Sequence, residues 1–186
     1  MLQTTSMTNT RKESSFPREL QISVIEEGKI AHLRLLPVGT VLGDQLTDNA
    51  YDDDGYRFHD VLHLAHMAVL GWSPVLRRFL GCKRKSNALV DDVEDGARAA
   101  ILEELIVAFV YANARERRYY HDIKHLDTEM LSTVKRLVSH LEVRKRRTQD
   151  WERAILQGYA AFRHLLDHRK AVFMIDLKQR QLKIIE

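Results

Sequence analysis

The chain of 186 residues contains a single cysteine, Cys82. One cysteine excludes an intramolecular disulfide and a cysteine-rich zinc site, and it fits a reducing cytoplasm. No apolar run approaches the roughly 18 residues of a membrane-spanning helix. The N-terminal segment MLQTTSMTNTRKESS is polar and lacks the apolar core of a signal peptide, so we expect residues 1–18 to form a flexible leader. These absences predict a cytoplasmic protein with no membrane partner.

A strong charge and a phosphate-binding glycine motif are also missing. The formal net charge of +3 is too small to indicate nucleic-acid binding, and no nucleic-acid-binding motif accompanies the basic runs. No Walker or Rossmann glycine-rich loop and no Ser-His-Asp or Cys-His nucleophile is evident. The composition, 45% hydrophobic and 30% charged, is that of an ordinary globular protein. We therefore expect one domain over residues 19–186.

Helical patterns dominate the middle of the chain, where turn residues separate apolar periodic segments. Thr128, and either Thr148 or Asp150, are placed to act as N-caps. Residues 81–96 are expected to form a loop. The expected helices span about 56–71, 74–81, 95–118, 127–145 and 149–168.

Two β-hairpins are expected at the ends of this helical region. Apolar, β-branched stretches flank residues 26–29, and apolar and polar residues alternate on both sides of residues 178–180. An isolated hairpin is marginal in water, so the two can pair with each other. Residues 37–55 are rich in turn-forming and acidic residues and are expected to form a long connection. The predicted fold is mainly α: a bundle of about five helices with small peripheral hairpins at the N- and C-terminal ends.

The segment DDDGYRFHDVLHLAH, residues 52–66, places ionisable side chains inside an apolar run. At about 100° per residue, His59, His63 and His66 fall within about 60° of arc, and Asp60 lies one turn from His63. The other faces of this helix are apolar, which is typical of a central helix. The histidines are either hydrogen-bonded core residues or ligands that face a specific site.

The long helix raises the same question with carboxylates. In ARAAILEELIVAFVYANA, residues 97–114, Glu103 and Glu104 have apolar neighbours on nearly every side, so at least one should face the core. A buried carboxylate is strongly unfavourable unless it is paired, protonated or bound to a metal. Either one glutamate is exposed and the other pairs with an arginine such as Arg98, or both belong to a polar site between helices.

Together the two helices offer imidazole and carboxylate ligands for a divalent metal. Magnesium or manganese is expected for an enzyme, with zinc, iron or nickel possible on imidazole ligands. The predicted metal ligands are His59, Asp60, His63, Glu103 and Glu104. The predicted catalytic residues are Asp60, His63 and Glu104. The basic residues Lys83, Arg84 and Lys85, in the loop between these helices, are predicted to bind a polyphosphate.

The stretch GDQLTDNAYDDDGYRFHDVLHLAHMAVLGWSPVLRRFLGCKRKSN, followed by VEDGARAAILEELIVAFVYA, resembles a domain that follows the catalytic domain in some MazG-type nucleoside triphosphate pyrophosphohydrolases. The motifs TDNAYDDDGYRFHD, LGWSP and KRKSN carry the resemblance, which covers about residues 40–115 and continues more loosely to the terminal hairpin. MazG-like enzymes are all-α and usually oligomeric, and they hydrolyse nucleoside triphosphates to monophosphate and pyrophosphate. Their magnesium ligands form an E-E-x-x-E motif and a later E-x-x-D. Glu103-Glu104 matches the first pair, and Val107 stands where the third glutamate would be.

Two hypotheses follow for the function. The first is a metal-dependent nucleotide (pyro)phosphohydrolase whose partners are a nucleotide, or another phosphorylated small molecule, and further copies of the chain. The second is a non-catalytic module that senses a nucleotide or supports an oligomer, in which the histidines and glutamates form a buried hydrogen-bond network. A nucleic-acid partner is not expected.

Overall fold

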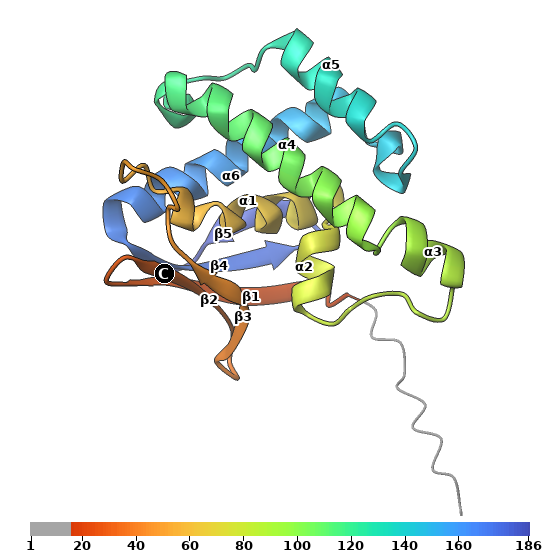
Figure 1. Cartoon of the computed structure of the whole chain (residues 1–186), viewed down its shortest axis with the longest axis horizontal. Helices are drawn as coiled ribbons and strands as arrows, with labels where there is room; N and C mark the ends of the chain where they lie inside the picture. The colour runs from red at the N-terminus through yellow and green to blue at the C-terminus, as the bar shows by residue number, and fades with distance from the viewer. Residues whose placement is uncertain (1–15) are drawn as a thin grey trace, which may run out of the picture.

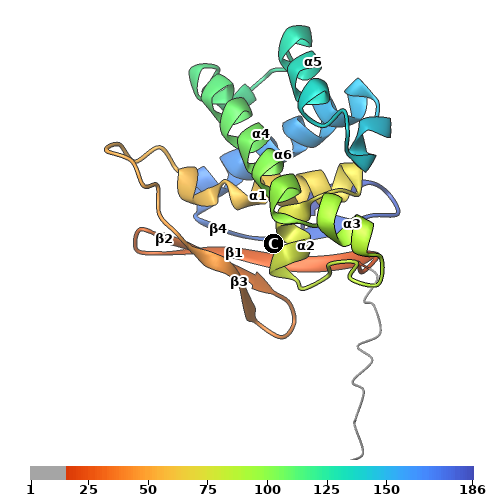
Figure 2. The same cartoon turned by 45° about the vertical axis from the view of Figure 1, so that its right-hand side comes forward.

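The structure, a computed structural model, describes residues 16–186. Most of the predicted leader, residues 1–15, lies outside this range. An antiparallel five-stranded sheet with the order β3-β2-β1-β4-β5 forms one layer, and the helices cover one of its faces (Figure 1). Figure 2 shows the same two layers from another side. The strands are β1 (Glu19–Glu27), β2 (Ile30–Leu35), β3 (Thr40–Leu46), β4 (Lys170–Asp176) and β5 (Gln181–Ile184).

The extent of this sheet shows that the predicted fold class was wrong. Both hairpins form where the sequence placed them, but they are not small peripheral additions to a helical bundle. β1 pairs with β4 along nearly its whole length, from Glu19 opposite Asp176 to Ile25 opposite Lys170, and this pairing joins the hairpins into one sheet. The joined sheet buries a complete apolar face against the helices, so it is a major layer of the domain.

A third strand lies in the predicted long connection. β3 is an edge strand of mixed exposure in which only Leu42 is fully buried, so its sequence shows little of the alternation that marks a strand. Gly43 has φ +66°, and the ring of Phe79 lies about where its side chain would project. Turn-like residues inside an exposed edge strand explain why the sequence resembled a loop.

The helical layer follows the predicted segments with three differences. Helix α5 ends at Leu137, so the helix expected over 127–145 is shorter, and only a 3-10 turn follows. A short helix, α3, lies in the predicted loop 81–96. Asp127, one residue before Thr128, accepts the capping hydrogen bond of α5. The helices are η1 (Tyr56–Phe58), α1 (Asp60–Ala65), η2 (His66–Leu70), α2 (Pro74–Phe79), α3 (Ala88–Val93), α4 (Ala97–Glu116), η3 (Arg118–Tyr120), α5 (Thr128–Leu137), η4 (Glu142–Lys145) and α6 (Thr148–His168). Among the described residues, none of these helices combines the length and apolarity needed to cross a membrane.

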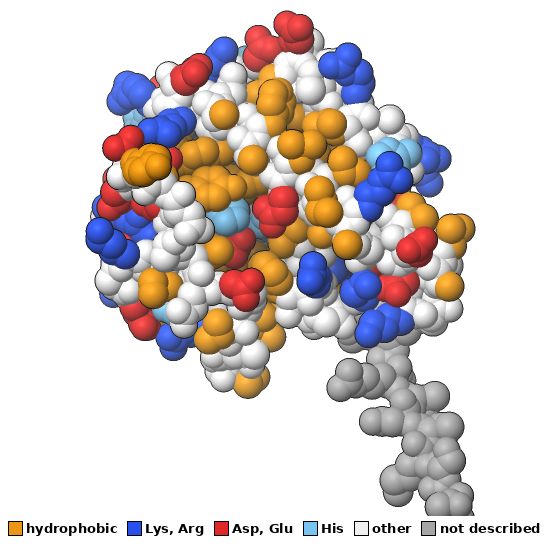
Figure 3. All heavy atoms as spheres, in the orientation of Figure 1, with side chains coloured by type: hydrophobic (Ala, Val, Ile, Leu, Met, Phe, Trp, Pro, Cys, Tyr) orange, Lys and Arg blue, Asp and Glu red, His pale blue; other side chains and the backbone are white. Residues whose placement is uncertain are grey.

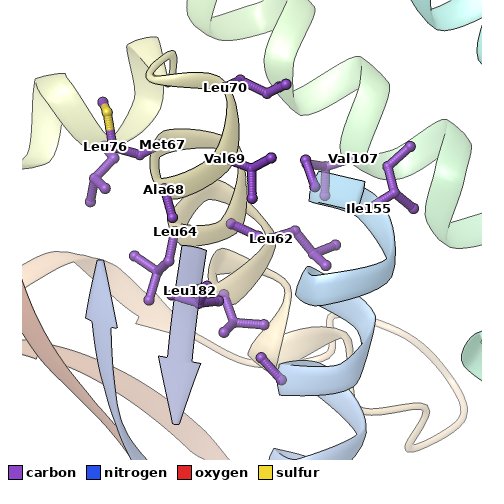
Figure 4. Packing of buried hydrophobic residues seen from close by; sticks show 14 of the residues in the cluster. Leu62, Leu64, Met67, Ala68, Val69, Leu70, Leu76, Val107, Ile155 and Leu182 are labelled. Atoms are coloured by element: carbon purple, nitrogen blue, oxygen red, sulfur yellow. The ribbon is translucent and has the colours of Figure 1, made fainter. Parts of the chain in front are cut away.

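The central helix, residues 56–70, comprises η1, α1 and η2 and lies between the sheet and the other helices. Figure 4 shows Leu62 and Val69 on the side that meets Val107 and Ile155, while Leu64 lies on the side toward Leu182 of β5; all of these side chains are buried. The resulting position, apolar contacts on both sides, explains why the sequence of this helix is apolar on most faces.

The last turn of the central helix has π geometry and ends inside the protein. Its final carbonyl groups have no helical partner, as at any helix C-terminus. Arg180 Nε donates to Val69 O at 2.8 Å, and Arg146 Nε donates to Leu70 O at 2.7 Å. Two arginines from distant parts of the chain thus stabilise the segment that carries His66.

Candidate metal centre

The histidines of the central helix face the two glutamates of α4. His63 contacts both carboxylates: its Nδ1 lies 3.0 Å from Glu103 Oε1, and its Nε2 lies 3.4 Å from Glu104 Oε1. The contacts divide into two sets that share His63. The inner cluster comprises His63, His66 and Glu103, and the outer cluster comprises His59, Asp60, His63 and Glu104.

Glu103 is the buried carboxylate at the centre of the inner cluster, with no exposed surface. His66 Nδ1 donates to Oε1 at 3.0 Å, and Ser73 Oγ and Val75 N each donate to Oε2 at 3.0 Å. Burial alone would raise the pKa of Glu103, but the nearby His63 and His66 lower it to about 2. The carboxylate is therefore ionised and paired with histidines rather than with an arginine.

The contact with Glu103 also affects the protonation of His63. Burial alone would lower the pKa of His63, yet the two glutamates raise it well above its ordinary value. Without a metal, this raised pKa favours a proton on both ring nitrogens: Nδ1 lies 3.0 Å from the ionised Glu103, and Nε2 faces the outer cluster, where a bound cation would replace its proton. A carboxylate that holds one histidine nitrogen while the other faces a metal is the common support of histidine ligands.

His59 is oriented in a similar way by the backbone. Its Nδ1 lies 2.8 Å from the carbonyl oxygen of Tyr56, which can only accept, so Nδ1 carries the proton and Nε2 carries the lone pair. The ring also stacks on Tyr56, with centroids 4.3 Å apart and planes 12° apart. His59 Nε2 lies 3.9 Å from Glu104 Oε2 and 3.5 Å from Asp60 Oδ1.

The donor atoms of the outer cluster have the spacing of a metal site. One ligand atom each from His59, His63 and Glu104 lie within 4.8 Å of one another. Two ligands at about 2.1 Å from one tetrahedral ion lie about 3.4 Å apart, comparable with the 3.4 Å from His63 Nε2 to Glu104 Oε1 and the 3.9 Å from His59 Nε2 to Glu104 Oε2. The cluster is therefore compact enough to bind one ion after small side-chain movements.

Three buried side-chain atoms of the outer cluster make no hydrogen bond among the described residues. They are both ring nitrogens of His63 and Oδ2 of Asp60, on side chains that are 1% and 3% exposed. Burial raises the pKa of Asp60, although His59 and His63 oppose this effect. Unpartnered buried polar atoms are rare and unfavourable, and a cation between His63 Nε2 and Asp60 Oδ2 would remove the deficit at those two atoms. The residues present thus fit a divalent metal.

The outer cluster opens to solvent on one side. The side chain of Glu104 is 43% exposed, whereas those of the other three residues are nearly buried. Figure 3 shows a histidine side chain beside acidic side chains in the middle of one face, surrounded largely by hydrophobic side chains. A site with buried protein ligands and one open side leaves room for water or a substrate.

The inner cluster has no open side for water or a substrate. The oxygens of Glu103 already receive His66, Ser73 and Val75, and the carboxylate has no exposed surface. Ser73 was not among the predicted site residues, although a Ser-Pro pair is a clear helix-start signal; its hydroxyl also accepts from Leu76 N as the N-cap of α2. The inner cluster supports the outer one and joins three helices.

The basic loop contacts other parts of the protein. Lys83 Nζ lies 3.1 Å from Asp91, and Arg84 pairs with Asp95 and Glu142 at 2.7 and 3.0 Å. Lys85 is exposed. The structure therefore brings together the predicted histidine and carboxylate ligands but engages Lys83 and Arg84 in ion pairs outside the two clusters.

Comparison with known families identifies the chain. A family model described as the MazG C-terminal domain matches residues 4–186. The chain belongs to the MazG C-terminal domain family. Searches of curated proteins and of solved structures found no match.

The magnesium ligands of MazG enzymes do not transfer directly to this MazG C-terminal domain. Glu103 lies in the inner cluster and Glu104 in the outer cluster, so the two glutamates do not act as one pair. Val107, in the place of the third glutamate, is buried in the core. The site has instead the mixed nitrogen and oxygen donors that suit manganese, iron, zinc or nickel better than magnesium.

Proposed function

We propose that this protein is a metal-dependent phosphohydrolase that acts on a nucleotide or a related phosphorylated small molecule. One divalent ion would be held by His59, His63 and Glu104, with Asp60 as a further oxygen ligand. The observation that carries the proposal is the approach of His59, His63 and Glu104 ligand atoms to within 4.8 Å of one another, beside the buried Asp60, with His63 Nε2 and Asp60 Oδ2 making no hydrogen bond among the described residues.

The chemistry of such a site suits phosphate esters. When bound, a divalent ion neutralises phosphate charge and lowers the pKa of a coordinated water. The protein's own residues supply orientation: Glu103 fixes His63, and the Tyr56 carbonyl fixes His59. Asp60 is placed to accept a proton, because its Oδ1 lies beside both imidazoles and its buried Oδ2 makes no hydrogen bond among the described residues. The basic loop is left out because Lys83 and Arg84 are engaged with carboxylates.

The test is a nucleotide panel with metal-stripped protein. Release of phosphate and pyrophosphate from nucleoside mono-, di- and triphosphates would be measured with added manganese, magnesium, zinc or nickel. We expect metal-dependent turnover that falls about a hundredfold or more in Glu104→Gln, which removes a charged ligand at an exposed position. Activity that is equal in Glu104→Gln, or absent with every metal, would show that the proposal is wrong.

The inner cluster supports a second candidate, a non-catalytic module that senses a nucleotide. Glu103 joins the central helix, the start of α2 and α4 through paired, buried contacts, as a network that specifies helix packing would. In that case the purified protein contains no stoichiometric metal, and a nucleotide raises the melting temperature without being hydrolysed. Elemental analysis together with thermal shifts separates the two candidates.

A further inference from the structure

The outward side of α4 is apolar along three turns. Every exposed position between residues 101 and 112 carries an apolar side chain. Ile101, Leu105 and Phe109, spaced four residues apart, are 66%, 48% and 37% exposed. Together with Ala108 and Ala112 they form what we call the α4 face.

This arrangement is unusual for a helix at the surface. The inward side of α4 is also apolar, with Ile106, Val107 and Val110 buried in the core. A helix that is apolar all round normally lies in the interior. Figure 1 shows α4 crossing the front of the molecule with no other element over it, and Figure 3 shows hydrophobic side chains gathered along the same diagonal. A contiguous apolar surface of this kind marks an interaction site.

We propose that the α4 face binds the same face of a second copy of the chain, with the two α4 helices antiparallel about a two-fold axis near Leu105. A two-fold interface must be self-complementary. The large side chains meet this condition, because Ile101 and Phe109 lie equally far from Leu105 on either side. In this arrangement Leu105 meets its own counterpart, and Ile101 meets Phe109 of the second copy.

The charges at the two ends of α4 favour the antiparallel direction. The N-terminal end is acidic on balance, with Asp91, Asp92 and Glu94 on and after α3 against the exposed Arg98 in the first turn of α4. The C-terminal end is basic on balance, with the exposed arginines Arg115, Arg117 and Arg118 against the exposed Glu116. An antiparallel pair places each acidic end beside a basic end, whereas a parallel pair would place like charges together. The charges at the ends of α4 and the spacing of its large side chains therefore both favour a second copy of the chain as the partner.

The interface would lie at the edge of the candidate metal centre. Glu104, the most exposed residue of the outer cluster, directly precedes Leu105. The second copy would thus flank the open side of that cluster. The proposal itself does not depend on a metal or on catalysis, so it can fail while the proposed function holds, and the reverse.

The first test is the mass of the full chain in solution, measured by sedimentation velocity. The chain has a mass of 21.7 kDa, and we expect wild-type protein to sediment at twice that mass. Leu105→Glu should sediment as the monomer, since it places a charge at the centre of the interface. Val38→Glu is the matched control, because Val38 is an exposed apolar residue in the β2–β3 turn, 79% exposed, and should leave the dimer intact. A monomeric wild type, or a dimer in Leu105→Glu, overturns the proposal.

A second test fixes the direction of the helices by oxidative cross-linking. Leu105→Cys should form a disulfide between copies, because a residue at a two-fold axis meets its counterpart. Ile101→Cys alone should not, but the double variant Ile101→Cys and Phe109→Cys should. The native Cys82 is buried and serves as the background in every sample. Equal cross-linking of Ile101→Cys and Leu105→Cys would contradict the antiparallel arrangement.

Discussion

His63 uses its two ring nitrogens for different contacts. Nδ1 lies against the buried, ionised Glu103, and Nε2 faces Asp60 and Glu104 in the outer cluster. At the scale of single residues, the Nδ1 contact positions the ring of His63, and the Nε2 side faces the ligands of the proposed metal. Glu103 stabilises the protein and orients the ring, while Glu104 offers its oxygens to a ligand.

Removal of the two glutamates should therefore have different effects on stability. Glu103→Ala leaves His63, His66, Ser73 and the Val75 amide without their shared acceptor. Loss of one partner from a buried charged network typically lowers the free energy of unfolding by about 3–5 kcal/mol. Glu104→Ala, at a partly exposed position, should lower it by less than about 1 kcal/mol. Urea denaturation of the metal-free variants measures both; equal losses would contradict the division of roles.

At the scale of elements, the fold depends on contacts between segments that are distant in the sequence. Arg84, in the loop before α3, donates through its backbone N, Nε and Nη2 to the carboxylate of Asp95, and it also pairs with Glu142 of η4. The Asp95 side chain is fully buried. This carboxylate joins the basic loop to the start of α4.

Asp95→Asn should lower the free energy of unfolding by about 1–3 kcal/mol at neutral pH, because a charged acceptor of several hydrogen bonds is lost. Burial alone would raise the pKa of Asp95, but Arg84 lowers it below the ordinary 3.8. A lowered folded-state pKa gives stability that is present above 3.8 and lost as the pH falls through the folded-state value. The difference in the free energy of unfolding between wild type and Asp95→Asn should thus shrink as the pH falls below 3.8. Chemical denaturation at a series of pH values checks the trend, and a constant difference would contradict it.

The approach of α6 to the central helix depends on a glycine. A side chain at Gly158 would place its Cβ 2.9 Å from Leu62 Cδ2 and 3.2 Å from Ala65 Cβ. Gly158→Val should therefore lower the free energy of unfolding by about 1–3 kcal/mol through overpacking. Ala160→Val, at an exposed position of the same helix, is the control and should change it little. Thermal denaturation compares the two; equal melting temperatures would show that the helices adjust freely.

At the scale of the whole molecule, the sequence predicted the helices and the facing of histidines and glutamates better than it predicted the sheet. Helical periodicity is local, so the stripe of His59, His63 and His66 can be read directly. The expected pairing of the two hairpins was confirmed, but its extent was not predicted, because it joins residues as distant as Ile25 and Lys170 and no local pattern specifies such a contact. The edge strand β3 was missed for a related reason, since its exposed side chains and Gly43 resemble a loop.

The same distinction holds within the candidate site. The sequence indicated that a glutamate of α4 is buried, but not which one, because Glu103 and Glu104 have equally apolar neighbours. The choice depends on Ser73 and Val75 at the start of α2, whose donors reach only Glu103. The partners of Arg84 could not be predicted from the sequence either, since Asp95 and Glu142 approach it only in the folded chain.

The central claim is that the outer cluster binds a divalent metal, and a cobalt(II) titration of metal-stripped protein tests it most directly. Visible absorption bands of bound cobalt report its coordination by imidazole and carboxylate. We expect wild-type protein to reach saturation at about one ion per chain, with binding at least about tenfold weaker in Glu104→Gln and unchanged in Lys85→Ala. No saturable binding, or equal binding by wild type and Glu104→Gln, would contradict the claim.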